Sequence, residues 1–133
     1  MDTRSKILTG AEAHSRAKGP LAVVIGTFDG LRAAHVHEIE AARRLPGVSG
    51  LLVLVLPGAG KLLPQRARAE LVAALRSVDY VVLAGADGLT GLLQASAPVH
   101  VVNLEAIDRR LSSELWQRVL SSRDRPPVTK ASY

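Results

Sequence analysis

Short apolar runs alternate along this chain with segments of helical periodicity. The runs are rich in valine, leucine and isoleucine, and such continuous apolar runs are typical of strands that are buried on both faces of a sheet. Strands are therefore predicted at Leu21–Ile25, Leu51–Leu56, Asp79–Ala84 and Val99–Val102. The longest apolar run, Leu51–Leu56, is far too short to cross a bilayer.

The segments between the predicted strands carry helical spacing. In Ala33–Leu45 the apolar residues recur every three positions, and a Pro-Gly pair ends the pattern. In Gln65–Ser77 the apolar residues also fall on one helical face. We expect buried helical positions at Val36, Ile39, Ala42, Leu71, Val72 and Leu75. Further helices are predicted over Leu89–Ala95 and Ser112–Leu120.

This rhythm of strand and helix predicts an α/β protein, a three-layer α/β/α sandwich with a parallel, Rossmann-like sheet of four or five strands. A chain of 133 residues favours one domain, expected over residues 1–122, with the polar residues 123–133 as a flexible tail. Ligands of such sheets bind beyond the carboxyl ends of the strands, at a topological switch point. The residues that follow each predicted strand are therefore the first candidates for a site.

Composition narrows the classes of function. The chain has no cysteine, which excludes disulfides and thiolate metal sites, and its first residues lead into no apolar signal segment, so we expect a cytoplasmic protein. The net charge is +5, but the basic residues are scattered and the chain has one Phe and one Trp, so we expect neither nucleic acid nor membrane as a partner. His35 and His37 are two residues apart, a spacing that does not suit zinc on a helix, and no metal site is predicted.

The segment after the first predicted strand carries the main candidate chemistry. Its glycines allow a tight turn, and a helix is expected to begin near Ala33, where free backbone amides and the helix dipole suit a phosphate group. Arg32 and His35 would lie in or beside the first helical turn and could add hydrogen-bond donors. The candidate phosphate-binding residues of the turn are Gly26, Thr27, Phe28 and Asp29.

Each of these side chains also has a simpler interpretation. Arg32 could be a solvated loop residue, and His35 could be a residue of the first helical turn without a task. Asp29 could cap the following helix through its carboxylate. The residue types alone do not decide between these alternatives.

The stretch GTFDGLRAAHVHEIEAAR resembles the GxFDxLHxGHxxxLxxAR signature of the HxGH-type, cytidylyltransferase-like nucleotidyltransferases. The resemblance implies that motif side chains and nearby amides hold the triphosphate of ATP or CTP with Mg²⁺. A phosphate of the second substrate then attacks the α-phosphorus, and pyrophosphate leaves. Catalysis of this kind depends on positioning and electrostatic stabilisation without a covalent intermediate. The resemblance therefore implies catalytic roles for His35 and for Arg32.

Further segments resemble the adenylyltransferase domain of ADP-heptose synthase, an enzyme of lipopolysaccharide precursor biosynthesis. They are Lys6–Thr9 with a short helix after it, the PxxxR spacing that ends at Arg68, and the stretch Glu70–Val82. A serine pair before the last predicted helix is similar to that family's phosphate-binding helix start. The resemblance implies phosphate-binding roles for Lys61, Arg68, Ser112 and Ser113.

The chain departs from that family pattern at several positions. Arg32 stands where the family has its first motif histidine, Ala34 stands where it has glycine, and the family's Lys-Gly-Asp-Tyr loop is missing after Asn103. The leading hypothesis is therefore a degenerate member, a pseudoenzyme that binds nucleotide or phosphate with weak or no transfer activity. The alternatives are an active adenylyl- or cytidylyltransferase that joins a nucleoside monophosphate to a sugar or polyol phosphate, and a non-catalytic interaction subunit. Because relatives commonly dimerise, we expect a homodimer or a partner of an active homologue.

Overall fold

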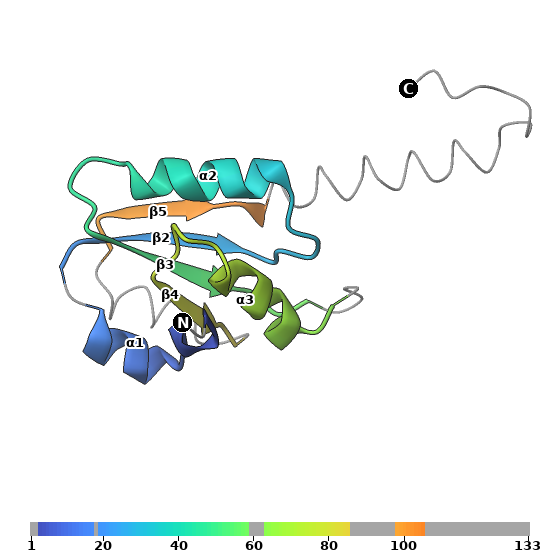
Figure 1. The fold of residues 1–133 in the computed structure, drawn as a ribbon. Helices are drawn as coiled ribbons and strands as arrows, with labels where there is room; N and C mark the ends of the chain where they lie inside the picture. The colour runs from blue at the N-terminus through green and yellow to red at the C-terminus, as the bar shows by residue number, and fades with distance from the viewer. Residues whose placement is uncertain (1–2, 18, 59–62, 86–97, 106–133) are drawn as a thin grey trace, which may run out of the picture.

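The computed structural model describes residues 3–17, 19–58, 63–85 and 98–105 (Figure 1). A short 3-10 helix at Thr3–Lys6 leads into the first strand. The strands are β1 (Ile7–Leu8), β2 (Leu21–Gly26), β3 (Gly50–Val55), β4 (Tyr80–Leu83) and β5 (His100–Asn103). The helices within these ranges are α1 (Gly10–Arg16), α2 (Ala33–Arg43) and α3 (Gln65–Ala73).

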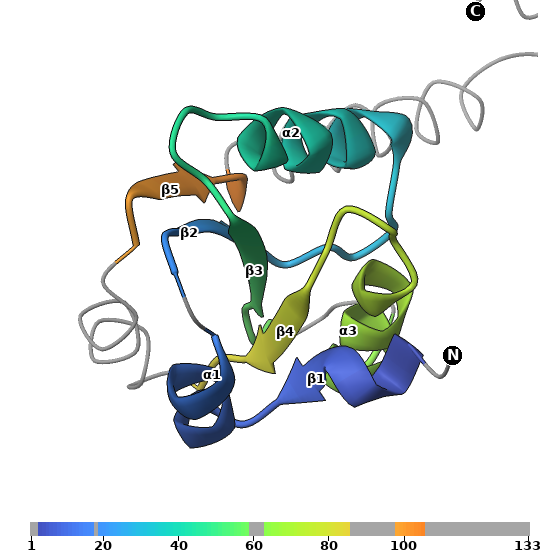
Figure 2. The same cartoon turned by 60° about the vertical axis from the view of Figure 1, so that its left-hand side comes forward.

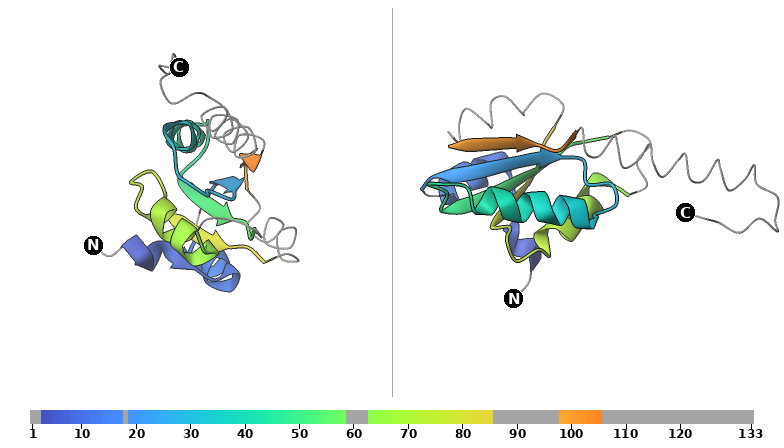
Figure 3. Two further views of the ribbon diagram at one scale, coloured as in Figure 1. Left: turned by 90° about the vertical axis from the view of Figure 1, so that its right-hand side faces the viewer. Right: turned by 90° about the horizontal axis from the view of Figure 1, so that it is seen from above.

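The five strands form one sheet in the order β1-β4-β3-β2-β5, and every neighbouring pair is parallel. The core residues of α2 and α3 cluster with one face of the sheet, and the core residue of α1 clusters with the other. The ribbon views show α1 on the opposite side of the sheet from α2 and α3 (Figures 2 and 3). The predicted three-layer α/β/α sandwich with a parallel sheet is confirmed.

The apolar runs located four of the strands to within two residues. β2 and β3 are buried along their whole length, as expected for strands that are covered on both faces. β1 was not predicted as a strand, because two residues are too few to show a pattern; it lies at the sheet edge, where Ile7 pairs with Val81. The predicted helices Leu89–Ala95 and Ser112–Leu120 and the tail 123–133 lie outside the described residues, so the domain boundaries stay predictions.

The prediction for the buried face of α3 was partly wrong. Val72 is buried as predicted, together with Ala69 and Ala73, but Leu71 is 42% exposed. Leu75 lies beyond the end of α3 and is partly buried against the core. Successive helix residues are rotated by about 100°, so Leu71 points away when Val72 points inward. Alanine methyl groups on the inner face let this helix approach the strands closely.

The buried positions of α2 are His35, Ile39 and Ala42, so Ile39 and Ala42 were predicted correctly, while Val36 is only partly buried. No helix in the part of the chain that the structure describes has the length and apolar character to cross a membrane.

A carboxylate joins the elements at the amino end of the sheet. Asp79, just before β4, accepts a hydrogen bond from the backbone N–H of Leu51 at 2.9 Å. It also forms an ion pair with Nη1 of Arg43, at the end of α2. The same Arg43 nitrogen lies 3.3 Å from the backbone oxygen of Ser77. One side chain therefore fixes the starts of β3 and β4 relative to the end of α2.

Asp79→Ala is expected to destabilise the fold by about 1–3 kcal/mol, because the N–H of the fully buried Leu51 would lose its partner. The matched control is Glu70→Ala, which removes only an exposed ion pair with Arg66 at 3.6 Å and should change stability by less than about 0.5 kcal/mol. Urea denaturation of both variants measures the difference. Equal effects would contradict a structural role for Asp79.

Candidate functional site

The sheet order places the topological switch point beside β2. From β2 the chain proceeds through β3 to β4 on one side, and β5 then pairs with the opposite side of β2. The crevice outside the carboxyl ends of β2 and β5 is therefore the position where such sheets bind ligands. The turn that starts at Gly26, which was singled out from the sequence, lies at this point.

A buried aromatic ring anchors this turn. Phe28 is fully buried and has a φ of 55°, in the left-handed region that residues other than glycine rarely adopt. Its ring lies 5.8 Å from the ring of His35, measured between centroids. The left-handed conformation costs about 1–2 kcal/mol, which the burial of the ring offsets. The Phe28 side chain thus belongs to the core, and only its backbone remains a candidate for ligand contact.

The first turn of α2 is held by His35. Arg32 is the N-cap residue, and its backbone N–H donates to Nδ1 of His35 at 3.0 Å. A ring nitrogen that accepts a hydrogen bond carries no proton, so the neutral imidazole bears its proton on Nε2. His35 is 2% exposed, whereas Arg32 is exposed. The histidine therefore has a structural task at the start of the helix, and the arginine lies at the surface of the same turn.

Arg68 is the most buried charged residue among those described, with 1% of its surface exposed. Its Nε donates to the backbone oxygen of Leu63 at 3.1 Å. Its Nη1 donates to the backbone oxygens of Thr27 at 2.6 Å and Leu56 at 2.8 Å. One guanidinium thus connects three segments by hydrogen bonds, namely the segment after β2, the segment after β3 and the segment just before α3.

The three partners of Arg68 are neutral carbonyl groups. No described carboxylate forms an ion pair with it, and its Nη2 takes part in none of the three hydrogen bonds. Burying a cation without a counter-ion costs several kcal/mol, even when part of its hydrogen bonding is satisfied. The end of the sheet at the switch point therefore holds a buried guanidinium whose hydrogen-bond partners among the described residues are backbone carbonyl groups.

Two further side chains connect the loops at this end. Asp29 Oδ1 accepts a hydrogen bond from the backbone N–H of Leu63 at 3.2 Å and so holds the segment before α3. The alternative that Asp29 caps α2 is wrong, because the N-cap residue of α2 is Arg32. Gln65 Nε2 donates to the backbone oxygens of Val55 at 2.8 Å and Ala84 at 2.9 Å. Gln65 was missed in the sequence, because a polar residue in the first turn of a helix has no distinguishing pattern.

The structure brings most of the candidate residues to the same end of the sheet. They are Gly26, Thr27, Phe28, Asp29, Arg32, His35 and Arg68. Lys61, Ser112 and Ser113 lie outside the described residues, and their assignments stay predictions. Over the described ranges, no group of three or more His, Cys, Asp or Glu residues could hold a metal ion.

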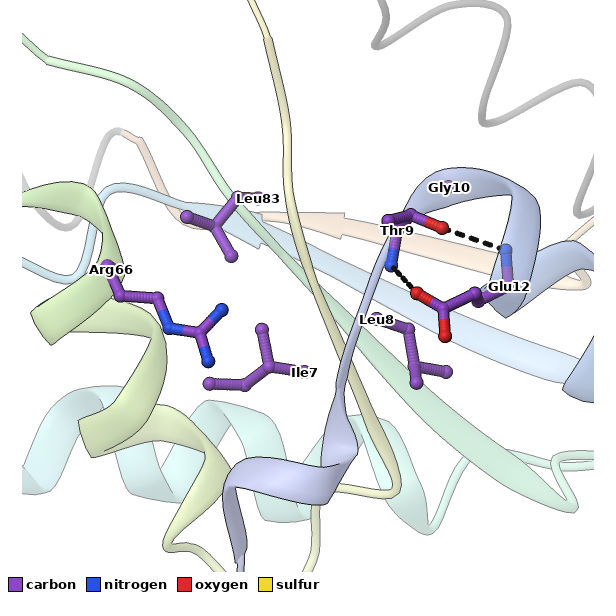
Figure 4. A pocket seen from close by; sticks show the side chains of 7 residues that line it. All are labelled: Ile7, Leu8, Thr9, Gly10, Glu12, Arg66 and Leu83. Atoms are coloured by element: carbon purple, nitrogen blue, oxygen red, sulfur yellow. Dashed lines mark hydrogen bonds between the residues drawn. The ribbon is translucent and has the colours of Figure 1, made fainter.

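A separate hollow of about 370 Å³ lies at the carboxyl ends of β1 and β4, two strands away from β2 (Figure 4). It is lined by Ile7, Leu8, Thr9, Gly10, Glu12, Arg66 and Leu83. Thr9 and Glu12 form a reciprocal cap of α1, and the hydrogen bond from the Thr9 backbone N–H lowers the pKa of the Glu12 carboxyl. The stabilisation from this cap is therefore fully present above the ordinary pKa of glutamate. It is lost as the pH falls through the lowered pKa of Glu12. These polar groups thus have a structural explanation.

Comparisons with known proteins support the fold. No family model and no curated protein matches the chain. Among solved structures, it is similar to the lipopolysaccharide core biosynthesis protein of Thermoplasma volcanium GSS1, with a TM-score of 0.58 and 20% sequence identity over 63% of this chain and 73% of the other. At this identity the similarity shows a shared α/β fold.

Arg68→Lys keeps the charge but removes the planar fork that reaches three carbonyl groups. We expect the free energy of unfolding to fall by about 1–3 kcal/mol, because buried carbonyls lose their donors. Arg66→Lys, two residues earlier on the exposed side of the same helix, should have an effect below about 0.5 kcal/mol. Thermal and urea unfolding compare the stabilities of the two variants. An Arg68→Lys variant that is as stable as the parent would contradict the proposal that Arg68 links the loops.

Proposed function

We propose that this protein is a degenerate nucleotidyltransferase-like protein that binds the phosphates of a nucleotide at the carboxyl ends of β2 and β5, with weak or no transfer activity. The observation that carries the proposal is the buried Arg68 cation, which lacks a carboxylate partner among the described residues and contacts Thr27 in the turn after β2. An α/β fold shared with a lipopolysaccharide core biosynthesis protein is consistent with it.

Three features of the site would act together on an anion. The N-terminal amides of α2 and the positive end of its dipole favour negative charge. The exposed Arg32 at the N-cap can donate two parallel hydrogen bonds to a phosphate. The buried charge of Arg68 adds a positive potential behind the turn.

The expected cofactor is Mg²⁺ with ATP or CTP. Mg²⁺ is commonly held by substrate phosphates together with one or two carboxylates, and it keeps several water ligands. Over the described ranges no cluster of potential protein ligands would hold the ion alone. The ion would therefore enter with the triphosphate.

The side chains of the turn explain why transfer should be weak. Arg32 is permanently charged, so it can stabilise a phosphate but cannot exchange a proton as a histidine would. Nδ1 of His35 is committed to the backbone N–H of Arg32. An active transferase that uses a sugar or polyol phosphate remains the second candidate, because an exposed arginine at the N-cap can supply electrostatic stabilisation.

Nucleotide binding is expected to raise the thermal stability of the protein. ATP, CTP, GTP and UTP, each with Mg²⁺, are compared by thermal unfolding, and a ligand at a hundred times its Kd adds about 2.7 kcal/mol. Inorganic tripolyphosphate should compete, because the proposed contacts are to phosphates. The absence of any shift with all four nucleotides would reject the proposal in favour of an interaction subunit.

Two substitutions test the residues at the start of α2. Arg32→Ala should weaken nucleotide binding about tenfold or more, since a hydrogen bond to a charged group is worth about 1.5–3 kcal/mol. His35→Asn should also weaken it, because the buried imidazole packs against Phe28 behind the turn. Asparagine can still accept the Arg32 N–H, so the helix start is retained while the imidazole ring is lost. Arg44→Ala, at the opposite end of α2, is the control and should bind like the parent. Unchanged binding by both site variants would place the nucleotide elsewhere.

Pyrophosphate release separates the two candidate functions. Heptose-1-phosphate and glycerol-3-phosphate are supplied with the nucleotide that gives the largest thermal shift. Stabilisation without turnover is the expected result for a degenerate member. Turnover that Arg32→Ala abolishes would instead establish an active transferase.

A further inference from the structure

The hollow at the carboxyl ends of β1 and β4 lies between two layers of the fold. Arg66 lines it from α3, which covers one face of the sheet, and Glu12 lines it from α1, which covers the other. Figure 4 shows the Arg66 side chain extending from α3 toward Ile7. The volume of about 370 Å³ lies within the range of small-molecule sites. A ligand in this hollow would therefore meet a cation and an anion that come from different layers.

The two charges of the hollow are paired within their own helices and not with each other. Arg66 lies 3.6 Å from Glu70, and Glu12 lies 3.8 Å from Arg16, in each case four residues along the same helix. Both distances exceed that of a hydrogen bond, and exposed pairs of this kind add little stability. In the described part of the chain Arg66 makes no hydrogen bond, and Glu12 accepts only the cap bond from Thr9, through Oε1. Both groups therefore keep hydrogen-bonding capacity for a ligand.

Much of the remaining lining of the hollow is aliphatic. Ile7 and Leu83 are partly buried against the core, and Leu8 is 7% exposed. Leu8 pairs with Val82, so the carboxyl ends of β1 and β4 lie side by side beneath the hollow. Apolar walls with a few polar groups that fix orientation are typical of small-molecule sites. An aliphatic group of a ligand would thus be removed from water between the two charged side chains.

We propose that this hollow binds a free amino acid with an aliphatic side chain. The Arg66 guanidinium donates two parallel hydrogen bonds to the α-carboxylate, and the Glu12 carboxylate accepts from the α-ammonium group. The aliphatic side chain of the ligand packs on Ile7 and Leu83. Glu12 repels a phosphate and Arg66 repels a simple amine, so the pair of charges selects a zwitterion. Because the candidate nucleotide site at β2 is two strands away, the two ligands bind independently.

Isothermal titration calorimetry of the full chain with L-leucine tests the site. Two analogues each lack one charge: 4-methylpentanoate has no ammonium group, and 3-methylbutylamine has no carboxylate. Each should bind about tenfold or more weaker than leucine, because one charged side chain is then left without its partner. Inorganic tripolyphosphate should not displace leucine, since its proposed site is at β2. The absence of leucine binding, equal affinity for the three compounds, or displacement by tripolyphosphate overturns the proposal.

Two substitutions test the charged residues of the hollow. Arg66→Ala removes the guanidinium, and Glu12→Gln removes the negative charge while glutamine can still accept the Thr9 N–H of the α1 cap. Each should weaken leucine binding about tenfold or more. Arg66→Ala should not weaken 3-methylbutylamine, which offers no carboxylate, whereas damage to the fold would weaken both ligands. Arg44→Ala and Glu40→Gln, which break a similar exposed pair on α2 at 3.8 Å, are the controls. Site variants that bind leucine like these controls overturn the proposal.

Discussion

The carboxyl end of the sheet depends on one buried guanidinium. Arg68 donates to backbone carbonyl groups of three separate segments, and partly buried carbonyl groups need such partners. The result is a group of loops that are joined to one another by a buried cation. In the proposed function, the stability of the loops and the affinity for an anion would come from the same side chain.

The layers of the fold follow from the amino-acid pattern, whereas its fine packing does not. Continuous apolar runs such as Leu51–Leu56 can be satisfied only by burial on both faces, so the parallel sheet was predictable. The side of α3 that faces the sheet was not predictable, because the neighbouring residues Leu71 and Val72 are both apolar and point in different directions from the helix. Packing against the sheet favoured the face with the smaller residues Ala69, Val72 and Ala73. β1 is defined by pairing with β4 alone, so it leaves no local pattern.

The position of the candidate site was also predictable, but the roles of its side chains were not. A turn after an apolar strand and before a helix is visible in the sequence, and the structure has it at the switch point. Asp29, His35 and Arg68 each form a hydrogen bond with a backbone group, and the sequence does not show which backbone group a side chain will meet. Phe28 illustrates the same limit, since its ring fills the core while its position in a motif suggests ligand contact.

The pairing of the outer strands has a consequence for synthesis on the ribosome. Ile7 pairs with Val81, and Ala22 pairs with His100, so both edges of the sheet join segments that are far apart along the chain. A nascent polypeptide that has exposed β2 and β3 must wait until β4 and β5 have been synthesised before the two edges of its sheet can form. Contacts over such long separations form slowly, and incomplete sheets expose apolar strand surface meanwhile. Newly made chains of this protein are therefore candidates for protection by chaperones until β5 has emerged.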